Sequence, residues 1–300
     1  MDKYPITSEL PVHQIERFIS GMPSLPATAA RVLELCNDPR TSPNDLNRVI
    51  TLDPILTGQV LKLVNSAYFS FNKQVTTIPR AIIILGMNTI KNLVLSTAVL
   101  NTLENATSIN ALFMEQFWLH SVCTGVAAKQ IAIIKEIPEA EREQYFVGGL
   151  LHDLGKIPLA HMFPVAYNEI IKAGSTEHVP VNMDENKAFG TNHARAGGII
   201  AKKWRLGEIM TDCLEFHHEP QSSDPKTRLT VQIIALANLF SNFFGTFHKH
   251  GEFLDKSNVY NVFENYGISP HTLDELEINV AQEIEKARIF LNLTVKSKNH

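Results

Sequence analysis

Cysteine is scarce in this sequence, with three residues in 300, at Cys36, Cys123 and Cys213, and no Cys-x-x-Cys pair. A sparse, odd number of cysteines does not build a disulfide framework and is typical of a protein from a reducing compartment. Cys123 follows His120 by three residues, so the two side chains can share a helical face. Because a free cysteine usually behaves as a small buried hydrophobe, we expect Cys123 to be a core residue and not a ligand.

Runs of basic residues are absent as well. The chain has 27 lysines and arginines against 31 aspartates and glutamates, which gives a formal net charge of −4. Proteins that bind nucleic acid phosphates usually carry a basic excess or a basic stripe, so we expect no nucleic acid partner. The hydrophobic content of 44% is typical of a globular protein with a proper core.

The sequence lacks a long uninterrupted apolar run. The nearest segment, Ile78–Leu100, is interrupted by Arg80, Gly86 and Lys91, whereas a membrane span needs about 18 consecutive apolar residues. The first ten residues carry charges and Pro5 where a signal peptide would be apolar. We therefore expect a cytoplasmic protein with no membrane partner.

Strands are not indicated either, because no stretch shows sustained period-two alternation bounded by hairpin turns. Helix signals are present instead. Ser42-Pro43-Asn44-Asp45 combines a capping residue, a proline at the first helical position and an acid in the first turn. Asp53-Pro54 repeats this arrangement, and Gly86 is expected to end a later helix. The predicted fold class is all-α.

Shifts in composition divide the chain into three predicted parts. A polar stretch at residues 101–110 separates an N-terminal helical lobe, residues 1–105, from a second helical unit, residues 106–250. A C-terminal helical extension follows over residues 251–300. Two polar segments of the second unit are expected to be loops, namely residues 174–192 and 220–226.

Histidines gather in four short segments of the second unit. These segments contain His120, the pair His152-Asp153, His193, and the doublet His217-His218. On a helix Lys156 lies four residues past His152 and three past Asp153, so the three side chains can address one space. Imidazoles with one carboxylate form a borderline-soft ligand set, which suits Fe, Mn, Zn, Co or Ni better than Mg or Ca.

In this order, the segments resemble the motif set of the HD superfamily: His120, then LLHDLGK, NHARAG and HHEP. The first half of the chain resembles the HDOD branch through PSLPATAARVLELCNDP, LDPILTGQVLKLVNSAYFS and TTIPRAIIILGMNTIKNLVLS. The resemblance covers most of the chain, and implies an N-terminal helical lobe packed on an HD-like helical bundle. HD enzymes are metal-dependent phosphohydrolases, whereas HDOD modules are mostly regarded as signalling outputs whose catalytic residues have often decayed.

Resemblance to the related HD-GYP enzymes implies the roles of individual residues. Six residues match metal ligands of the pattern, namely His120, His152, Asp153, His193, His217 and His218, and Asn238 occupies the seventh ligand position. Lys156 matches a lysine that faces the substrate phosphate. Two residues are therefore expected to be catalytic: Asp153 would orient the attacking water, and Lys156 would hold the substrate phosphate. The alternative for Lys156 is a side chain that simply extends to solvent.

The chain departs from the pattern at two acidic positions. Asn238 stands where the pattern closes with an aspartate, and Gln116 where a carboxylate precedes the first histidine by one helical turn. The GYP signature is absent after HHEP, which argues against hydrolysis of cyclic dinucleotides. Because two negative charges are lost, cation binding should be weaker. The expected cofactor is one or two divalent transition metal ions, Fe or Mn first and Zn or Ni next.

Two functional hypotheses remain open. The protein is either a bacterial signal-transduction protein whose HD site hydrolyses a small phosphoester or nucleotide, or a catalytically silent scaffold that acts through contacts with a signalling partner protein.

Other polar residues have plainer interpretations. Glu185 is expected on the surface, and Glu219 either orients an imidazole or is solvated. The histidines outside the motifs are expected to be solvated: His248, His250 and His300.

Overall fold

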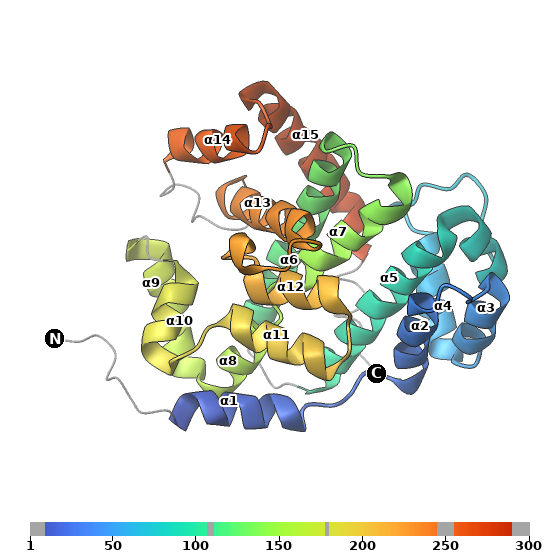
Figure 1. Cartoon of the computed structure of the whole chain (residues 1–300), viewed down its shortest axis with the longest axis horizontal. Helices are drawn as coiled ribbons and strands as arrows, with labels where there is room; N and C mark the ends of the chain where they lie inside the picture. The colour runs from blue at the N-terminus through green and yellow to red at the C-terminus, as the bar shows by residue number, and fades with distance from the viewer. Residues whose placement is uncertain (1–9, 107–110, 178–179, 245–254, 290–300) are drawn as a thin grey trace.

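The computed structural model describes residues 10–106, 111–177, 180–244 and 255–289, and within these ranges it contains helices and turns but no β-strand (Figure 1). The predicted all-α fold class is therefore confirmed. The helices are α1 Leu10–Gly21, α2 Ala27–Asn37, α3 Pro43–Thr51, α4 Pro54–Val64, α5 Ile78–Ala106, α6 Ala111–Ile134, α7 Glu139–Leu151, α8 Lys156–Met162, α9 Pro164–Glu177, α10 Val181–Phe189, α11 His193–Lys203, α12 Glu208–Phe216, the 3₁₀ turn η1 Pro220–Ser222, α13 Arg228–Phe244, α14 Lys256–Asn265 and α15 Pro270–Ala287.

The helix-start signals of the sequence act as predicted. The Ser42 side chain accepts a hydrogen bond from the backbone N–H of Asp45, whose carboxylate accepts one from the Ser42 backbone in return. At the start of α4, Asp53 caps the N–H of Leu56 at 3.0 Å. Gly86 has a φ of 81°, and the helical path breaks there. The chain then resumes a helix at once, so Gly86 produces a kink inside α5.

Helices α6 and α7 form the centre of the fold, and two glycines let their backbones touch. A Cβ at Gly149 would lie 2.7 Å from the Cα of Gly125, and a Cβ at Gly125 would lie 2.7 Å from the carbonyl oxygen of Phe146. No larger residue fits either position without movement of the backbone. This close crossing brings His120 of α6 near His152, which follows the last residue of α7.

Two helices are long and apolar enough to cross a membrane by length and composition. They are the Ile78–Leu103 part of α5 and the Phe113–Ile134 part of α6. Their most apolar windows are 61% and 72% buried within the fold, and both helices contribute to the hydrophobic core. Burial of this kind is what the core helices of a soluble fold show.

Helix α1 lies along α8 and α11 rather than beside α2 (Figure 1). The Lys203 ammonium, in α11, donates to three carbonyl oxygens at the end of α1, those of Ile19, Ser20 and Met22. These bonds give further partners to carbonyls near a helix end, where the intrahelical hydrogen bonds run out. They fasten the first described helix to the helix that begins with His193. The three-part division of the chain stays a prediction.

The prediction of a loop over residues 174–192 is wrong. Helix α9 extends to Glu177, and α10 covers Val181–Phe189. Polar composition suggested a loop, but Phe189 packs into the core and Gly190, with a φ of 68°, ends α10 in the left-handed conformation. The predicted junction at 101–110 also falls partly within a helix, since α5 continues to Ala106, and residues 107–110 lie outside the described ranges.

Candidate metal centre

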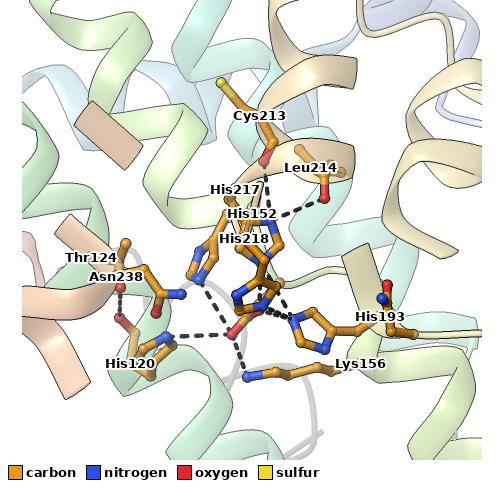
Figure 2. A network of polar contacts seen from close by, with 12 residues as sticks. His120, Thr124, His152, Lys156, His193, Cys213, Leu214, His217, His218 and Asn238 are labelled. Carbon is orange, nitrogen blue, oxygen red and sulfur yellow. Dashed lines mark hydrogen bonds and ion pairs between the residues drawn. The ribbon is translucent and has the colours of Figure 1, made fainter. Parts of the chain in front are cut away.

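Asp153 lies in the turn between α7 and α8, and four imidazoles surround its carboxylate. Figure 2 shows how the histidines lie relative to one another. Oδ2 of Asp153 is 3.4 Å from Nε2 of His120 and 3.3 Å from Nε2 of His152. Its Oδ1 is 3.2 Å from Nε2 of His193 and 3.7 Å from Nε2 of His217. Each carboxylate oxygen therefore faces a different pair of imidazoles. The structure brings together motif residues that are up to 97 positions apart, from His120 to His217.

The backbone fixes the orientation of two of these imidazoles. Nδ1 of His152 lies 2.7 Å from the carbonyl oxygen of Gly149, and Nδ1 of His217 lies 3.1 Å from that of Leu214. A carbonyl oxygen only accepts hydrogen bonds, so each Nδ1 carries the proton. Each Nε2 then presents its lone pair toward Asp153. A lone pair and a carboxylate oxygen cannot bond to each other, but both can bind a cation.

Glu185 holds the third imidazole. Its Oε2 lies 2.6 Å from Nδ1 of His193 and accepts a hydrogen bond from the His193 backbone N–H at 2.8 Å. Its Oε1 accepts from the hydroxyl of Tyr167, in α9, at 2.9 Å. Glu185 is fully buried, so the prediction of a surface position is wrong. One feature of the pattern pointed to burial of this helical face, namely the apolar Phe189 four residues later.

His218 completes a second group of imidazoles. Its Nε2 lies 2.9 Å from Nε2 of His193, and Nε2 of His217 lies 3.3 Å from the same atom. His193, His217 and His218 thus form one group of potential ligand atoms, and His120, His152 and Asp153 form another. Burial lowers the pKa of His120 to about 3, which keeps that imidazole neutral and able to act as a ligand.

The two groups fit divalent transition metal ions. With metal–nitrogen bonds of about 2.0–2.1 Å, neighbouring ligand atoms of a tetrahedral site lie about 3.3 Å apart, close to the separations around Asp153. The buried Nε2 of His152 has no hydrogen-bond partner among the described residues. Buried polar atoms without partners are rare, and a metal ion would supply one here. These residues could therefore hold a metal ion.

The electrostatics of the cluster also favour a cation. Burial raises the pKa of Asp153, but His152 and Lys156 outweigh this effect and hold that pKa well below its usual range. Burial lowers the pKa of His193, but the carboxylates of Glu185 and Asp153 outweigh it and raise that pKa to about 9. The position between the two carboxylates is therefore one where positive charge is stabilised.

Lys156 is part of the cluster. Its Nζ lies 2.6 Å from Oδ2 of Asp153, its side chain is 20% exposed, and it lines the cavity above the cluster. The alternative that it extends to solvent does not describe the structure. Gly155 allows this geometry, because a Cβ there would lie 1.9 Å from the carbonyl oxygen of His193. The first residues of α8 and α11 thus meet at the site.

The two positions that lack the expected carboxylates also line the cavity. Asn238, in α13, is 8% exposed, and its side-chain oxygen accepts a hydrogen bond from Asn242 at 3.1 Å. Its amide is directed toward the histidine cluster (Figure 2). Gln116 lies one helical turn before His120 on the same face of α6. The two amides therefore occupy the side of the cavity where two more acidic ligands were expected.

The remaining predictions concern Cys123, Glu219 and the histidines outside the motifs. Cys123 is buried, as predicted for a core residue, and burial raises its pKa to about 11. Glu219 is exposed and is bonded to no imidazole among the described side chains, which favours the solvated alternative. Three histidines expected to be solvated lie outside the described residues, namely His248, His250 and His300.

The structure therefore defines this chain as an all-helical protein with a buried cluster of histidines around an aspartate. The HDOD domain family matches residues 22–220, more than half of the chain. The chain belongs to the HDOD family. The match ends before α13, so Asn238 lies beyond it.

Solved structures share this fold over almost the whole chain. An HDOD domain protein of unknown function from Geobacter sulfurreducens has a TM-score of 0.73 and 23% identity, covering 96% of this chain and 99% of its own. A candidate phosphohydrolase from Shewanella amazonensis SB2B has a TM-score of 0.71 and 19% identity, covering 97% and 100%. At these identities the similarity shows the fold alone.

The chain also resembles a curated protein to which no function is assigned. An uncharacterized protein of Treponema pallidum (strain Nichols) is 24% identical over 225 residues, which are 75% of this chain and 43% of the relative. The chain thus spans less than half the length of the curated relative that it matches.

Proposed function

We propose that this protein is a signal-transduction protein whose HD-type metal centre hydrolyses a small phosphoester. The observation that carries the proposal is the orientation of His152, His193 and His217. Each holds Nδ1 against a carbonyl or carboxylate oxygen and turns Nε2 toward Asp153. Hydrogen bonds that fix the tautomer and direction of an imidazole are typical of metal-binding histidines.

The metal ions in this proposal are divalent transition metals, with Fe or Mn favoured and Zn or Ni as alternatives. Each oxygen of Asp153 faces a different pair of imidazoles, and the two ligand groups would hold one or two ions. Seven residues are assigned to the site, namely His120, His152, Asp153, His193, His217, His218 and Asn238. Buried Glu185 contributes a further negative charge through His193, and so offsets part of the charge lost at Asn238 and Gln116.

Two side chains are assigned to catalysis. A bound ion would act as a Lewis acid at the phosphoryl group and lower the pKa of the attacking water. The Lys156 ammonium, at the floor of the cavity, would bind a phosphate oxygen as a point charge. Asp153 would accept a hydrogen bond from the attacking water and so fix its direction. When phosphate binds, Lys156 exchanges its ion pair with Asp153 for one with the substrate.

A specific observation favours a second candidate function, a catalytically silent scaffold. Asn238 and Gln116 are amides at the positions where carboxylates were expected, and both line the cavity. Neutral ligands balance cation charge poorly in a buried site, and loss of one ion would leave the fold intact. Such a protein would act through contacts with a signalling partner protein. Under either function we propose a cytoplasmic location and no nucleic acid partner.

The test is a hydrolysis assay with a panel of phosphoesters, using protein loaded with Mn²⁺ or Fe²⁺. We expect turnover that His152→Ala abolishes, and Asn238→Asp should raise it because a carboxylate restores charge balance. Exposed Asn258→Asp, in α14, is the matched control and should leave turnover unchanged. Metal-loaded protein with no turnover on any phosphoester, before and after Asn238→Asp, would exclude the hydrolase and leave the scaffold.

A further inference from the structure

The cavity above the metal centre extends well beyond the histidines. Its volume is about 530 Å³, within the range of small-ligand sites, about 300–1,000 Å³. The histidines and Lys156 form one end of it. Helices α6 and α13, the start of α10 and the end of α14 provide the other walls. A ligand that fills the cavity therefore has a phosphate at one end and a second chemical group at the other.

The charge of the lining limits the number of phosphates. Apart from the histidines, Lys156 is the only cationic side chain among the described residues that line the cavity, and Asp153 is the only acidic one. A chain of phosphates would place several negative charges beyond the reach of Lys156 and the metal centre. Uncompensated charge in a partly buried site is costly. The lining thus favours a single phosphate.

Aromatic rings line the wall next to His120. Phe113 and Phe117 are four residues apart on the cavity face of α6, and their rings stack with centroids 6.3 Å apart and planes inclined by 20°. Tyr266, at the end of α14, also lines the cavity. Flat aromatic ligands stack on such rings, as nucleobases do on aromatic side chains.

Uncharged amides line the other walls. Gln232 and Asn242 lie ten residues apart on the face of α13 that borders the cavity, with Asn238 between them. Asn182, near the start of α10, has a buried side-chain oxygen without a hydrogen-bond partner among the described residues. An amide side chain offers a donor and an acceptor together, and with both it can bind the edge of a nucleobase.

We infer that the cavity binds a nucleoside monophosphate, with the phosphate at Lys156 and the base between the aromatic wall and the amides of α13. This inference rests on the proposed function, because it places the phosphate at the same metal centre. It names a narrower class, since nucleoside triphosphates and dinucleotides carry more phosphates than the lining can neutralise.

Calorimetric titration of the Mn²⁺-loaded protein at low temperature tests the inference, with phosphate release measured in the same samples. The probes are the four common ribonucleoside monophosphates, orthophosphate and ATP. We expect at least one monophosphate to bind tenfold or more tightly than either orthophosphate or ATP. Equal affinity for orthophosphate and all four monophosphates, or tighter binding of ATP, would overturn the inference and leave the metal centre in place. No binding of any probe would overturn both.

Substitution of an amide separates recognition of the base from binding of the phosphate. Gln232→Leu should weaken the preferred monophosphate about threefold to tenfold, the value of one or two hydrogen bonds, and should change the affinity for orthophosphate much less. The matched control is Gln282→Leu on the exposed face of α15, which should bind both ligands as the wild type does. An equal loss of affinity for both ligands in Gln232→Leu would also contradict the inference.

Discussion

Glu185 shows how one side chain can set the properties of the candidate metal centre. It is fully buried, and its two oxygens hold His193 and Tyr167. A carboxylate on the far nitrogen of a metal-binding imidazole fixes its direction and makes it a stronger donor. The sequence could not reveal this role, because Glu185 sits among polar residues and its partner is eight positions away.

Glu185→Gln should therefore weaken metal binding about 10- to 100-fold, the usual effect of losing such a partner. The glutamine keeps an oxygen beside His193 but removes the charge. Competition with a chromophoric chelator measures the metal affinity, and circular dichroism checks the fold. Glu208→Gln, an exposed acid in the first turn of α12, is the control and should bind metal normally. An intact Glu185→Gln protein with wild-type affinity would contradict this role.

Lys129 and Glu143 join α6 to α7 and to the segment between α4 and α5. The ammonium lies 2.8 Å from Oε2 of Glu143 and 2.9 Å from the hydroxyl of Tyr68, which in turn lies 3.2 Å from Oε1 of Glu143. Glu143 is 3% exposed. Its charge therefore depends on Lys129 for compensation, and loss of one partner from a buried ion pair is strongly destabilising.

Lys129→Met should lower the free energy of unfolding by about 3 kcal/mol, because it leaves the buried carboxylate uncompensated. Urea unfolding followed by circular dichroism measures the change. Adding Glu143→Gln should return a large part of the loss, since the uncompensated charge is then removed. Lys62→Met, an exposed lysine in α4, should stay within about 0.5 kcal/mol of the wild type. Equal stability of Lys129→Met and Lys62→Met would show that the ion pair contributes little.

Helix α8 depends on a glycine for its approach to α11. A Cβ at Gly155 would lie 1.9 Å from the carbonyl oxygen of His193 and 2.6 Å from the backbone nitrogen of Gly197. Backbone atoms cannot rotate away as a flexible side chain can. A larger residue here must separate the two helices, and that movement also displaces Lys156 and His193.

Gly155→Ala should destabilise the protein by about 3 kcal/mol or more, at the upper end of overpacking costs, and should reduce metal binding as well. Thermal unfolding and metal analysis of the same sample measure both effects. Gly58→Ala is the matched control, since a Cβ there meets nothing within 4 Å. In the middle of α4 it should stabilise by about 0.5–1 kcal/mol. A Gly155→Ala protein as stable as the wild type would disprove the close approach.

The sequence predicted some helices better than others. The caps at Ser42 and Asp53 act within three residues, so the pattern of the sequence was sufficient to place α3 and α4. Helix α10 was mistaken for a loop because its segment is largely polar, whereas in the structure Phe189 is buried in the core. Contacts of that kind depend on distant parts of the chain.

The complete site exists only in the assembled bundle. Its residues come from α6, α11 and α13 and from the ends of α7, α8 and α12 (Figure 2), and five of them surround the carboxylate of Asp153. The grouping of the histidines followed from the motifs and their resemblance to the HD pattern. The division of Asp153 between two imidazole pairs, the anchoring of each Nδ1 and the cavity above them required the positions of all these helices at once.

Elemental analysis of the purified protein tests the central claim most directly. The protein is prepared without a chelator or a histidine tag, beside a His152→Ala/Asp153→Ala variant, and both are measured for Fe, Mn, Zn and Ni. We predict close to one or two transition metal ions per wild-type chain and none above background in the variant. A wild-type protein that carries no metal and cannot be loaded with any of the four would contradict the existence of the metal centre.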